Sequence, residues 1–164
     1  MCGFAGFYGQ EKEKEEILQN MLRTIVHRGP DSEGKYLDED IALGFRRLSI
    51  VDLSEHGNQP MFNENRSLVL VYNGEIYNTD DLRHKLTTLG VHFKTTSDTE
   101  VLLLGFIHFG PSFIQDVDGI FALAVYDERH ETLTLFRDCF GVKPLFYTQT
   151  GNTFVFASEL KGLF

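Results

Sequence analysis

The sequence predicts an α+β domain in which mostly antiparallel strands pack against helices. Three observations predict this class: short β-rich runs, helical spacing of apolar residues in other segments, and polar or Gly-containing turns between the runs. Turns of that kind favour hairpins. With 164 residues and 42% hydrophobic residues, the chain is large enough for one substantial core. No linker or shift in composition divides it, so we expect one domain over residues 1–164.

The first helix is expected to start in the charged run at residues 11–16 and to end at Gly29-Pro30. The acidic first turn suits the helix dipole, and a Gly-Pro pair ends a helix. The apolar residues that recur at helical spacing are Ile17, Leu18, Met21, Leu22 and Ile25.

Two more helices are expected further along the chain. One spans about residues 80–89. The other begins at Ser97, which forms a capping box with Glu100. The residues that follow, VLLLGFIHF, are apolar nearly all round, which predicts a deeply buried helix.

Six short runs predict strands. They cover residues 41–45, 68–72, 120–126, 132–136, 145–148 and 153–156. Asn73-Gly74 follows the second run, and Asn-Gly is a strong signal for a type I′ hairpin turn. Taken alone, the pair is therefore expected to form a turn.

Composition excludes several classes of function. The net charge of −9 argues against a nucleic-acid or anionic-membrane surface. No apolar stretch approaches the roughly 18 residues that span a membrane, and no basic region of a signal peptide opens the chain. We find no metal-ligand spacing, phosphate loop or dinucleotide fingerprint, and we expect no cofactor in this domain.

The two cysteines, Cys2 and Cys139, form no CxxC pair. The sequence leaves a disulfide between them open, but a domain of this size does not need one. Free thiols fit a reducing cytoplasm. Cys139 is expected to be inert.

Cys2 directly follows Met1, and a small residue in that place permits removal of the initiator methionine. Cys2 would then carry a thiol and a free α-amine. A thiol nucleophile needs a base, and an α-amine with a pKa of about 7.7–8.0 can accept a proton near pH 7. The alternative is a small hydrophobe on a first strand. Position 2 alone favours that alternative, but the rest of the chain favours catalysis.

Other polar residues suggest a site for a free amino acid. Arg47 ends a predicted strand, where it is either a surface charge or a bidentate clamp for a carboxylate. Besides forming a turn, Asn73 and the Gly74 backbone N–H could donate to an oxyanion. Glu75 and Asp98 could hold an ammonium group, although Asp98 also suits a helix N-terminus on charge alone.

Two prolines lie in segments for which we expect structural roles. Arg28 and Asp31 flank the turn at Pro30 and could form a local ion pair. Pro144 is compatible with a turn or a cis bond.

Ordered motifs along the chain carry a family resemblance. They are MCGFAG, HRGPD, RLSIVDLS, GNQPM, YNGEIYN, SDTEVLL, DGIFALAVYD, RDCFGVKPLFY and FASELKGLF. The chain resembles the glutaminase domain of glutamine-dependent asparagine synthetases, a class II glutamine amidotransferase of the N-terminal nucleophile hydrolase superfamily. Amidotransferases that feed sugar-phosphate or purine synthesis also begin with Met-Cys-Gly, but RGPD and YNGEIYN resemble the asparagine synthetase branch more closely.

The resemblance implies a four-layer αββα sandwich of two antiparallel sheets flanked by helices. It also implies that Cys2, after loss of Met1, attacks the side-chain amide of L-glutamine and forms a γ-glutamyl thioester. Asn73 and Gly74 would form the oxyanion hole. The residues that would bind glutamine are Arg47 for its carboxylate, Glu75 and Asp98 for its ammonium group, and Leu48, Ser49, Ile50 and Val51 as a lining loop.

The synthetase half of this family, with its SGGxDS loop, does not occur in these residues. ATP and Mg are expected only for that half. We expect the glutaminase domain to act with a synthetase domain in cis or in trans, either as an excised domain or as a stand-alone glutaminase. The alternatives are a non-catalytic domain that binds glutamine or docks a partner, and the glutaminase half of an amidotransferase with another ammonia acceptor. An exposed apolar patch is expected where the synthetase half would dock.

Overall fold

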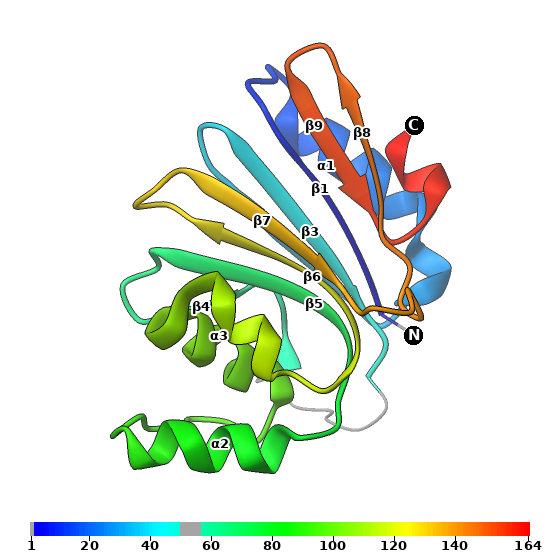
Figure 1. Cartoon of the computed structure of the whole chain (residues 1–164). Coiled ribbons are helices and arrows are strands. Elements are labelled where there is room, and N and C mark those ends of the chain that lie inside the picture. The colour runs from blue at the N-terminus through cyan, green and yellow to red at the C-terminus, as the bar shows by residue number, and fades with distance from the viewer. Residues whose placement is uncertain (1, 50–56) are drawn as a thin grey trace.

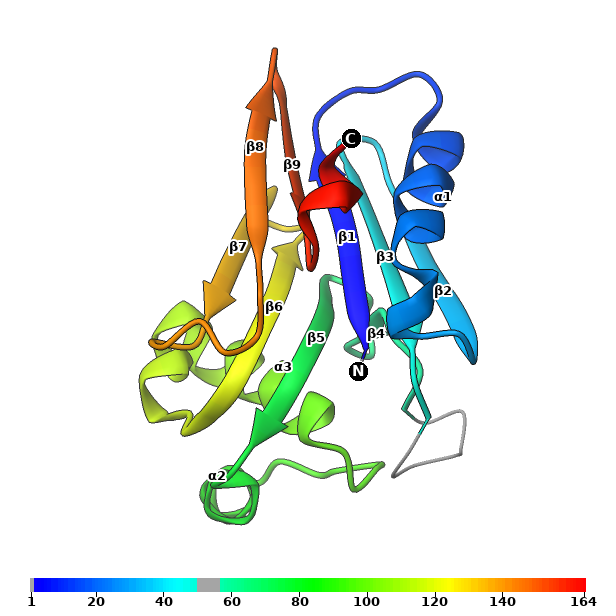
Figure 2. The same ribbon diagram turned by 90° about the vertical axis from the view of Figure 1, so that its right-hand side faces the viewer.

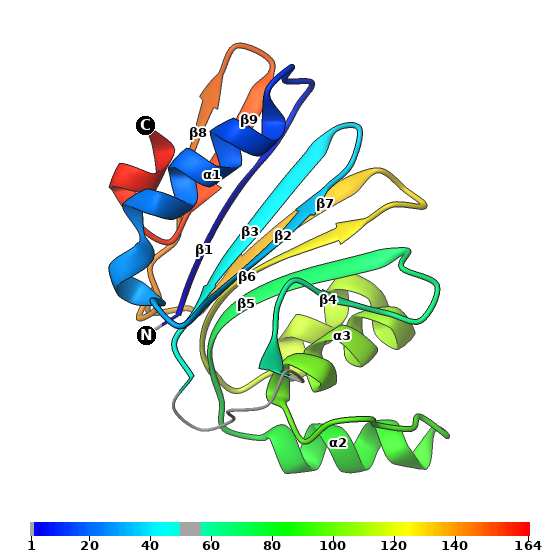
Figure 3. The same ribbon diagram turned by 180° about the vertical axis from the view of Figure 1, so that it is seen from behind.

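A computed structural model describes residues 2–49 and 57–164. Two antiparallel sheets pack face to face, and helices cover their outer faces (Figure 1). One sheet has the strand order β2-β3-β1-β9-β8 and the other β4-β5-β6-β7. The views in Figure 2 and Figure 3 show α1 on the outside of the first sheet, and α2 and α3 on the outside of the second. The predicted α+β class and the four-layer arrangement are confirmed.

The first sheet places the N-terminal strand at its centre. Its strands are β1 (Gly3–Tyr8), β2 (Ser32–Leu37), β3 (Ile41–Arg47), β8 (Phe146–Thr150) and β9 (Thr153–Ala157). β1 pairs with β3 on one side and with β9 on the other. β2 was not predicted, because this edge strand buries none of its residues fully and has no hydrophobic alternation.

The second sheet contains β4 (Met61–Phe62), β5 (Leu68–Ile76), β6 (Gly119–Asp127) and β7 (Thr132–Arg137). β5 pairs with β6 along its whole length, from Leu68 opposite Asp127 to Ile76 opposite Gly119. The expected hairpin turn at Asn73-Gly74 is therefore wrong: both residues lie inside β5. A Cβ atom on Gly74 would lie 2.3 Å from the Ile120 carbonyl oxygen, so this glycine serves close approach to β6.

The first helix is shorter than expected. α1 (Lys14–Thr24) packs Leu18, Met21 and Leu22 inward, and a short 3₁₀ turn (Val26–Arg28) follows it. Three β-branched residues, at positions 24–26, end the helix before Gly29. Such residues are stiff at χ1 and disfavour continued helix.

The helices α2 (Thr79–Thr88) and α3 (Asp98–Phe109) cover the second sheet. Half of the expected capping box forms: the Ser97 hydroxyl accepts the Glu100 N–H at 3.2 Å. The Glu100 carboxylate instead accepts the backbone N–H groups of Lys94 and Thr95, at 2.8 and 2.7 Å. These bonds fix the approach to α3, and with it the position of Asp98.

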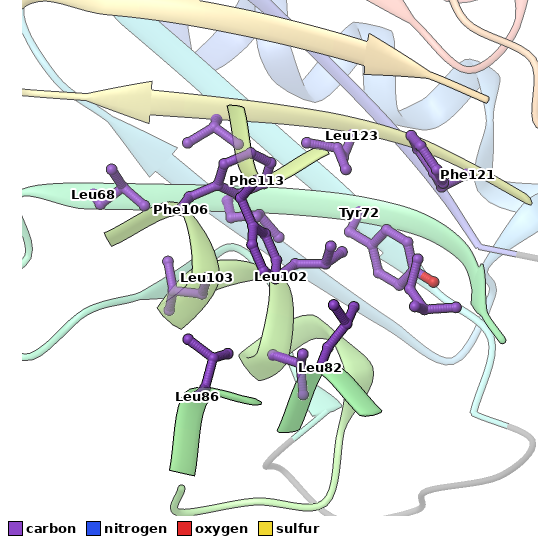
Figure 4. Close-up of a cluster of buried hydrophobic side chains, with 14 of the residues drawn as sticks. Leu68, Tyr72, Leu82, Leu86, Leu102, Leu103, Phe106, Phe113, Phe121 and Leu123 are labelled. Atoms are coloured by element: carbon purple, nitrogen blue, oxygen red, sulfur yellow. The ribbon is translucent and has the colours of Figure 1, made fainter. Parts of the chain in front are cut away.

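The sheets contribute to two hydrophobic clusters on opposite faces of β5. Leu68, Leu70 and Tyr72 pack against α2 and α3, together with residues such as Phe106 and Phe113 of the helical layer (Figure 4). Val69 and Val71 pack between the sheets. This alternation turns Tyr72 and its neighbour Asn73 toward opposite faces of the same strand. Short 3₁₀ segments, Gly110–Asp116 and Leu160–Leu163, complete the described elements.

Candidate active site

Cys2 lies directly before β1, and both its thiol and its carbonyl group are held. The backbone N–H of Leu48 donates to the Cys2 Sγ at 3.3 Å, and Sγ lies 3.7 Å from the Leu48 carbonyl oxygen. The Arg28 Nε donates to the Cys2 carbonyl oxygen at 3.1 Å. Cys2 and Cys139 are both free thiols; Cys2 is half-buried and Cys139 is exposed.

Cys2 lines a cavity of about 430 Å³, within the usual range for small-molecule sites. The ends of β1 and β3 meet β5 and the start of α3 there (Figure 2). The cavity is lined by Cys2, Phe45, Arg47, Leu48, Gly57, Gln59, Tyr72, Asn73, Gly74, Ser97, Asp98, Thr99 and Lys143. The cavity thus brings together Cys2, Arg47, Leu48, Asn73, Gly74 and Asp98 from the sequence-based set.

Asn73 contributes a buried donor to this cavity. The residue is 4% exposed, and its Nδ2 has no hydrogen-bond partner within the described residues. A buried polar group without a partner costs about 1–3 kcal/mol. An unpaired amide donor that lines a cavity is suited to a ligand oxygen.

The backbone N–H of Gly74 points away from β6, toward the β4 edge of β5. Antiparallel bonds alternate along a strand, and Tyr77 N–H bonds to Asp118 on the β6 side. The N–H of every odd residue of β5 therefore points toward β6, and that of Gly74 points toward the β4 edge. β4 pairs no further along β5 than Leu70, so it does not reach Gly74.

The side chain of Gln59 makes the hydrogen bonds to Tyr72 that the backbone of a neighbouring strand would otherwise make. Its carboxamide donates to the Tyr72 carbonyl oxygen at 3.0 Å and accepts the Tyr72 N–H at 2.6 Å. Its backbone packs tightly against β2, because a Cβ atom on Gly34 would lie 1.8 Å from the Gln59 carbonyl oxygen. The cis proline bond lies at Gln59-Pro60, not at Pro144. Sequence reasoning noted the GNQPM motif but assigned Gln59 no role.

Arg47 and the following residues form one wall. Arg47 is 8% exposed, and its Nη1 donates to Asn58 Oδ1 at 2.9 Å. The N–H of Ser49 donates to the Asp31 carboxylate at 2.7 Å. The expected Arg28–Asp31 ion pair is not formed, because Arg28 pairs with Glu159 at 3.1 Å instead.

Two further residues of the expected lining loop, Ile50 and Val51, lie outside the described residues.

Asp98 and Tyr72 form a buried hydrogen-bonded pair. The Tyr72 hydroxyl donates to Asp98 Oδ2 at 2.8 Å. Burial raises the pKa of the Asp98 carboxyl above its ordinary value, although bonds from Tyr72 and from the backbone of Ile76 and Thr99 oppose the shift. Burial also raises the pKa of Tyr72, reinforced by the charge of Asp98. Tyr72 therefore stays a neutral donor to the carboxylate.

Glu75 occupies a different environment from Asp98. It is exposed on β5, two residues after Asn73, and does not line the cavity. Its charge still contributes to the raised pKa of Tyr72. Glu75 therefore lies within electrostatic range of the site.

The loop before β8 brings Lys143 to the cavity. Asp138 is 5% exposed, and its carboxylate accepts the backbone N–H groups of Phe121, Phe140, Val142 and Lys143, at 3.0–3.2 Å. Burial alone would raise the pKa of Asp138, but these bonds outweigh it and lower the pKa. The sequence analysis named the RDCFGVKPLFY motif but assigned no role to Lys143 or Asp138.

Residues 2–49 and 57–164 contain no group of three His, Cys, Asp or Glu side chains that could hold a metal ion.

Among the helices that the structure describes, none combines the length and the apolar character needed to cross a membrane.

Comparison with known proteins identifies the class. The model of the glutamine amidotransferase domain family matches residues 1–164, and the chain belongs to this family. It is 43% identical to asparagine synthetase [glutamine-hydrolyzing] 1 of Bacillus subtilis, over 99% of this chain and 26% of that protein. It is 38% identical to asparagine synthetase B of Escherichia coli, over 99% of this chain and 30% of that protein. The chain thus spans between a quarter and a third of the length of these relatives.

A solved structure shows the same fold. The glutamine phosphoribosylpyrophosphate amidotransferase of B. subtilis superimposes with a TM-score of 0.84 at 24% sequence identity. The match covers 98% of this chain and 42% of that chain. The family match and the curated relatives together identify the chain as a glutamine amidotransferase domain related to asparagine synthetases.

We predict that Asp138→Asn will destabilise the domain at pH 7 by at least about 2 kcal/mol, because the amide offers a donor where the carboxylate accepts four backbone N–H groups. Because the folded-state pKa of Asp138 is lowered, its stabilising effect is present above the unfolded-state pKa. It is lost as the pH falls through the folded-state value. Urea unfolding of the parent chain and of Asp138→Asn, from pH 7 down into the acid range, measures the difference in the free energy of unfolding.

The control is Asp116→Asn. The Asp116 carboxylate pairs with Lys85 at 2.9 Å, and both side chains are 45% exposed. Its loss should cost less than about 1 kcal/mol. Equal effects of the two substitutions would contradict the role assigned to Asp138.

Proposed function

We propose that this domain hydrolyses L-glutamine to L-glutamate and ammonia, with Cys2 as the nucleophile after loss of Met1. One observation carries the proposal: the Cys2 thiol and the unpaired, buried Asn73 amide line the same cavity. Acyl transfer needs a nucleophile and a donor for the developing oxyanion. The cavity supplies both.

The chemistry proceeds by acyl transfer through the thiol. The Cys2 Sγ attacks the glutamine side-chain carbonyl carbon, while the α-amine of the processed chain takes up the thiol proton. The carbonyl oxygen gains negative charge between Asn73 Nδ2 and the Gly74 N–H. The C–N bond then breaks, the leaving nitrogen takes the proton, and ammonia departs. Water next cleaves the γ-glutamyl thioester, which gives glutamate and restores the thiol.

The remaining cavity residues recognise the amino-acid end of glutamine. Arg47 suits the α-carboxylate, because its planar group pairs with carboxylates bidentately. Asp98 suits the α-ammonium group, with Glu75 adding negative charge nearby. Of the loop that the family resemblance assigns to the glutamine site, Leu48 lines the cavity, whereas Ser49 does not. The Leu48 N–H already contacts the nucleophile.

The ammonia is proposed to serve a synthetase domain in cis or in trans. The relatives named asparagine synthetases support this use, and they extend well beyond the matched region. ATP and Mg belong to that synthetase unit, and we propose no cofactor for this domain. A reducing cytoplasm would keep both cysteines free.

We predict that Cys2→Ala will abolish glutamate release, because the variant removes the nucleophile. The unfolding transition should stay unchanged, because Cys2 is only half-buried. Glutamate release and thermal unfolding are measured on the same samples. The intact mass, recorded before and after treatment with a diazo-ketone glutamine analogue, should show loss of Met1 and one adduct at Cys2.

Cys139→Ala is the matched control, because Cys139 is exposed and outside the cavity. It should keep full activity and one adduct. Glutamate release by Cys2→Ala would contradict the proposal. Loss of Met1 without an adduct, together with glutamine binding, would favour a non-catalytic glutamine-binding domain.

Asn73→Ala should lower kcat about 10²–10³-fold, the effect of removing one oxyanion donor. The KM for glutamine should change little, because the donor acts mainly on charge that develops in the transition state. Steady-state kinetics on the variant and the parent chain measure both constants. A rise in KM at unchanged kcat would assign Asn73 to ground-state binding instead.

The KM for glutamine should rise as the pH falls, because protonated Asp98 cannot balance the α-ammonium charge. Since the pKa of Asp98 is raised by burial, the rise should begin at a higher pH than for an ordinary aspartate. KM measured against pH should lose this dependence in Asp98→Asn. An identical pH dependence in both proteins would contradict the role of Asp98.

A further inference from the structure

Glu159 connects the end of β9 to the nucleophile through Arg28. The Glu159 Oε1 accepts from Arg28 Nη1 at 3.1 Å and contacts His27 Nε2 at 2.8 Å. Its Oε2 lies 3.3 Å from Lys161 Nζ. The Arg28 Nε, on the same guanidinium group, donates to the Cys2 carbonyl oxygen. Glu159 and Arg28 do not line the glutamine cavity.

Cys2 depends on such contacts because it lies outside the strand ladder. The pairing of β1 with β3 begins at Gly3, opposite Arg46. Beyond that point, Cys2 is held by the Leu48 N–H at the thiol and by Arg28 at the carbonyl oxygen. The absence of a side chain on Gly3 leaves space for Arg28: a Cβ atom there would lie 3.0 Å from Arg28 Cδ and Nε.

Arg28 in turn depends on Glu159. The Arg28 side chain is 11% exposed, and its Nη2 has no hydrogen-bond partner in the part of the chain that the structure describes. Glu159 is the one carboxylate that pairs with Arg28 among those residues. Removing the carboxylate from this partly buried pair leaves the guanidinium charge uncompensated, which favours rearrangement of the side chain.

The pKa of Glu159 is lowered, as expected for a carboxylate that pairs with cationic side chains. Burial would raise it, but the bonds from His27, Arg28 and Lys161 outweigh burial and lower it. Glu159 is therefore a stable anion opposite the guanidinium group across the neutral pH range.

We propose that Glu159 is a positioning residue for the nucleophile: it holds Arg28 in the geometry in which Arg28 fixes the Cys2 carbonyl group. The inference rests on the proposed glutaminase function. Glu159 would act by orienting Cys2. The thiol, the α-amine and the carbonyl group that Arg28 holds all belong to Cys2, so fixing the carbonyl group also orients the two reactive groups. Neither Glu159 nor Arg28 lines the cavity proposed for glutamine, so their role is not direct binding of the substrate.

Kinetics of Glu159→Gln test this role. kcat for glutamate release should fall about tenfold to a hundredfold, as expected for a small displacement of a reacting group. KM should stay within twofold of the parent value, about the scatter of such measurements, because the substituted residue lies outside the cavity. Lys161→Gln is the matched control: it removes a contact to the other oxygen of the same carboxylate and leaves the Arg28 pair intact.

A double-mutant cycle separates action through Arg28 from a general effect on the fold. In an Arg28→Ala background, Glu159→Gln should lower kcat no further, because the group through which it acts is gone. Independent, multiplicative losses would overturn the assignment. Thermal unfolding of each variant identifies any loss that comes from unfolded protein.

A spectroscopic measurement makes the test independent of turnover. Because the chain has two cysteines, ¹³C labelling of cysteine carbonyl carbons gives one signal from Cys2 and one from Cys139. Glu159→Gln should shift the Cys2 signal and leave the Cys139 signal in place, and Lys161→Gln should shift neither.

The outcomes distinguish the two proposals. An active parent chain with unchanged kcat and an unchanged Cys2 signal in Glu159→Gln would overturn the positioning role alone. A parent chain that releases no glutamate would overturn the proposed function. In that case the Cys2 carbonyl signal still decides whether Glu159 positions the residue.

Discussion

The central position of β1 is the constraint on which the site depends. β1 pairs with β3 from Gly3 to Tyr8, and its other edge pairs with β9. The register that places Gly3 opposite Arg46 also brings Leu48, two residues further along, to the Cys2 thiol. A strand bonded on both edges cannot slide without breaking two ladders and reversing its buried faces. Cys2 is thereby given a fixed place at the boundary between the sheets.

The site lies where three layers of the sandwich meet. Asn73 projects from the β5 face that packs on the first sheet, whereas Tyr72 projects from the face that packs on α2 and α3. Asp98, at the start of α3, bonds to Tyr72 and thereby ties the helical layer to the sheet. Both hydrophobic clusters must therefore be packed before the donor, the carboxylate and the thiol share one cavity.

Much of this arrangement could be predicted from the sequence, because local patterns and ordered motifs carry it. The α+β class, the helical segments and the grouping of Cys2 with Arg47, Asn73 and Asp98 follow from spacing, residue chemistry and the family resemblance. Local pattern failed at Asn73-Gly74, where nine paired residues with β6 outweigh the turn preference of one dipeptide. It also failed for β2, which has no buried face to mark it.

The missed site residues depend on contacts between segments distant in sequence. The Gln59 side chain forms two hydrogen bonds with the backbone of Tyr72, as a neighbouring strand would. Lys143 lies at the cavity because the Asp138 carboxylate binds the backbone N–H groups of its loop. The expected Arg28–Asp31 pair was wrong because Arg28 finds Glu159, 131 residues away. Reasoning from a sequence pattern pairs residues that are close along the chain, whereas these contacts join residues that only the folded structure brings together.

The brevity of β4 has a consequence for how the domain treats its own strand edge. A longer β4 would pair with Gly74 and consume the N–H that faces the cavity; the strand stops early, and the Gln59 carboxamide covers the edge only at Tyr72. An open strand edge ordinarily invites another chain to pair with it. Here the uncovered stretch borders a cavity that residues of other segments also line. Because the Gln59 carboxamide already occupies the edge at Tyr72, a neighbouring polypeptide would have to displace it to pair along this stretch, whereas a small molecule would not.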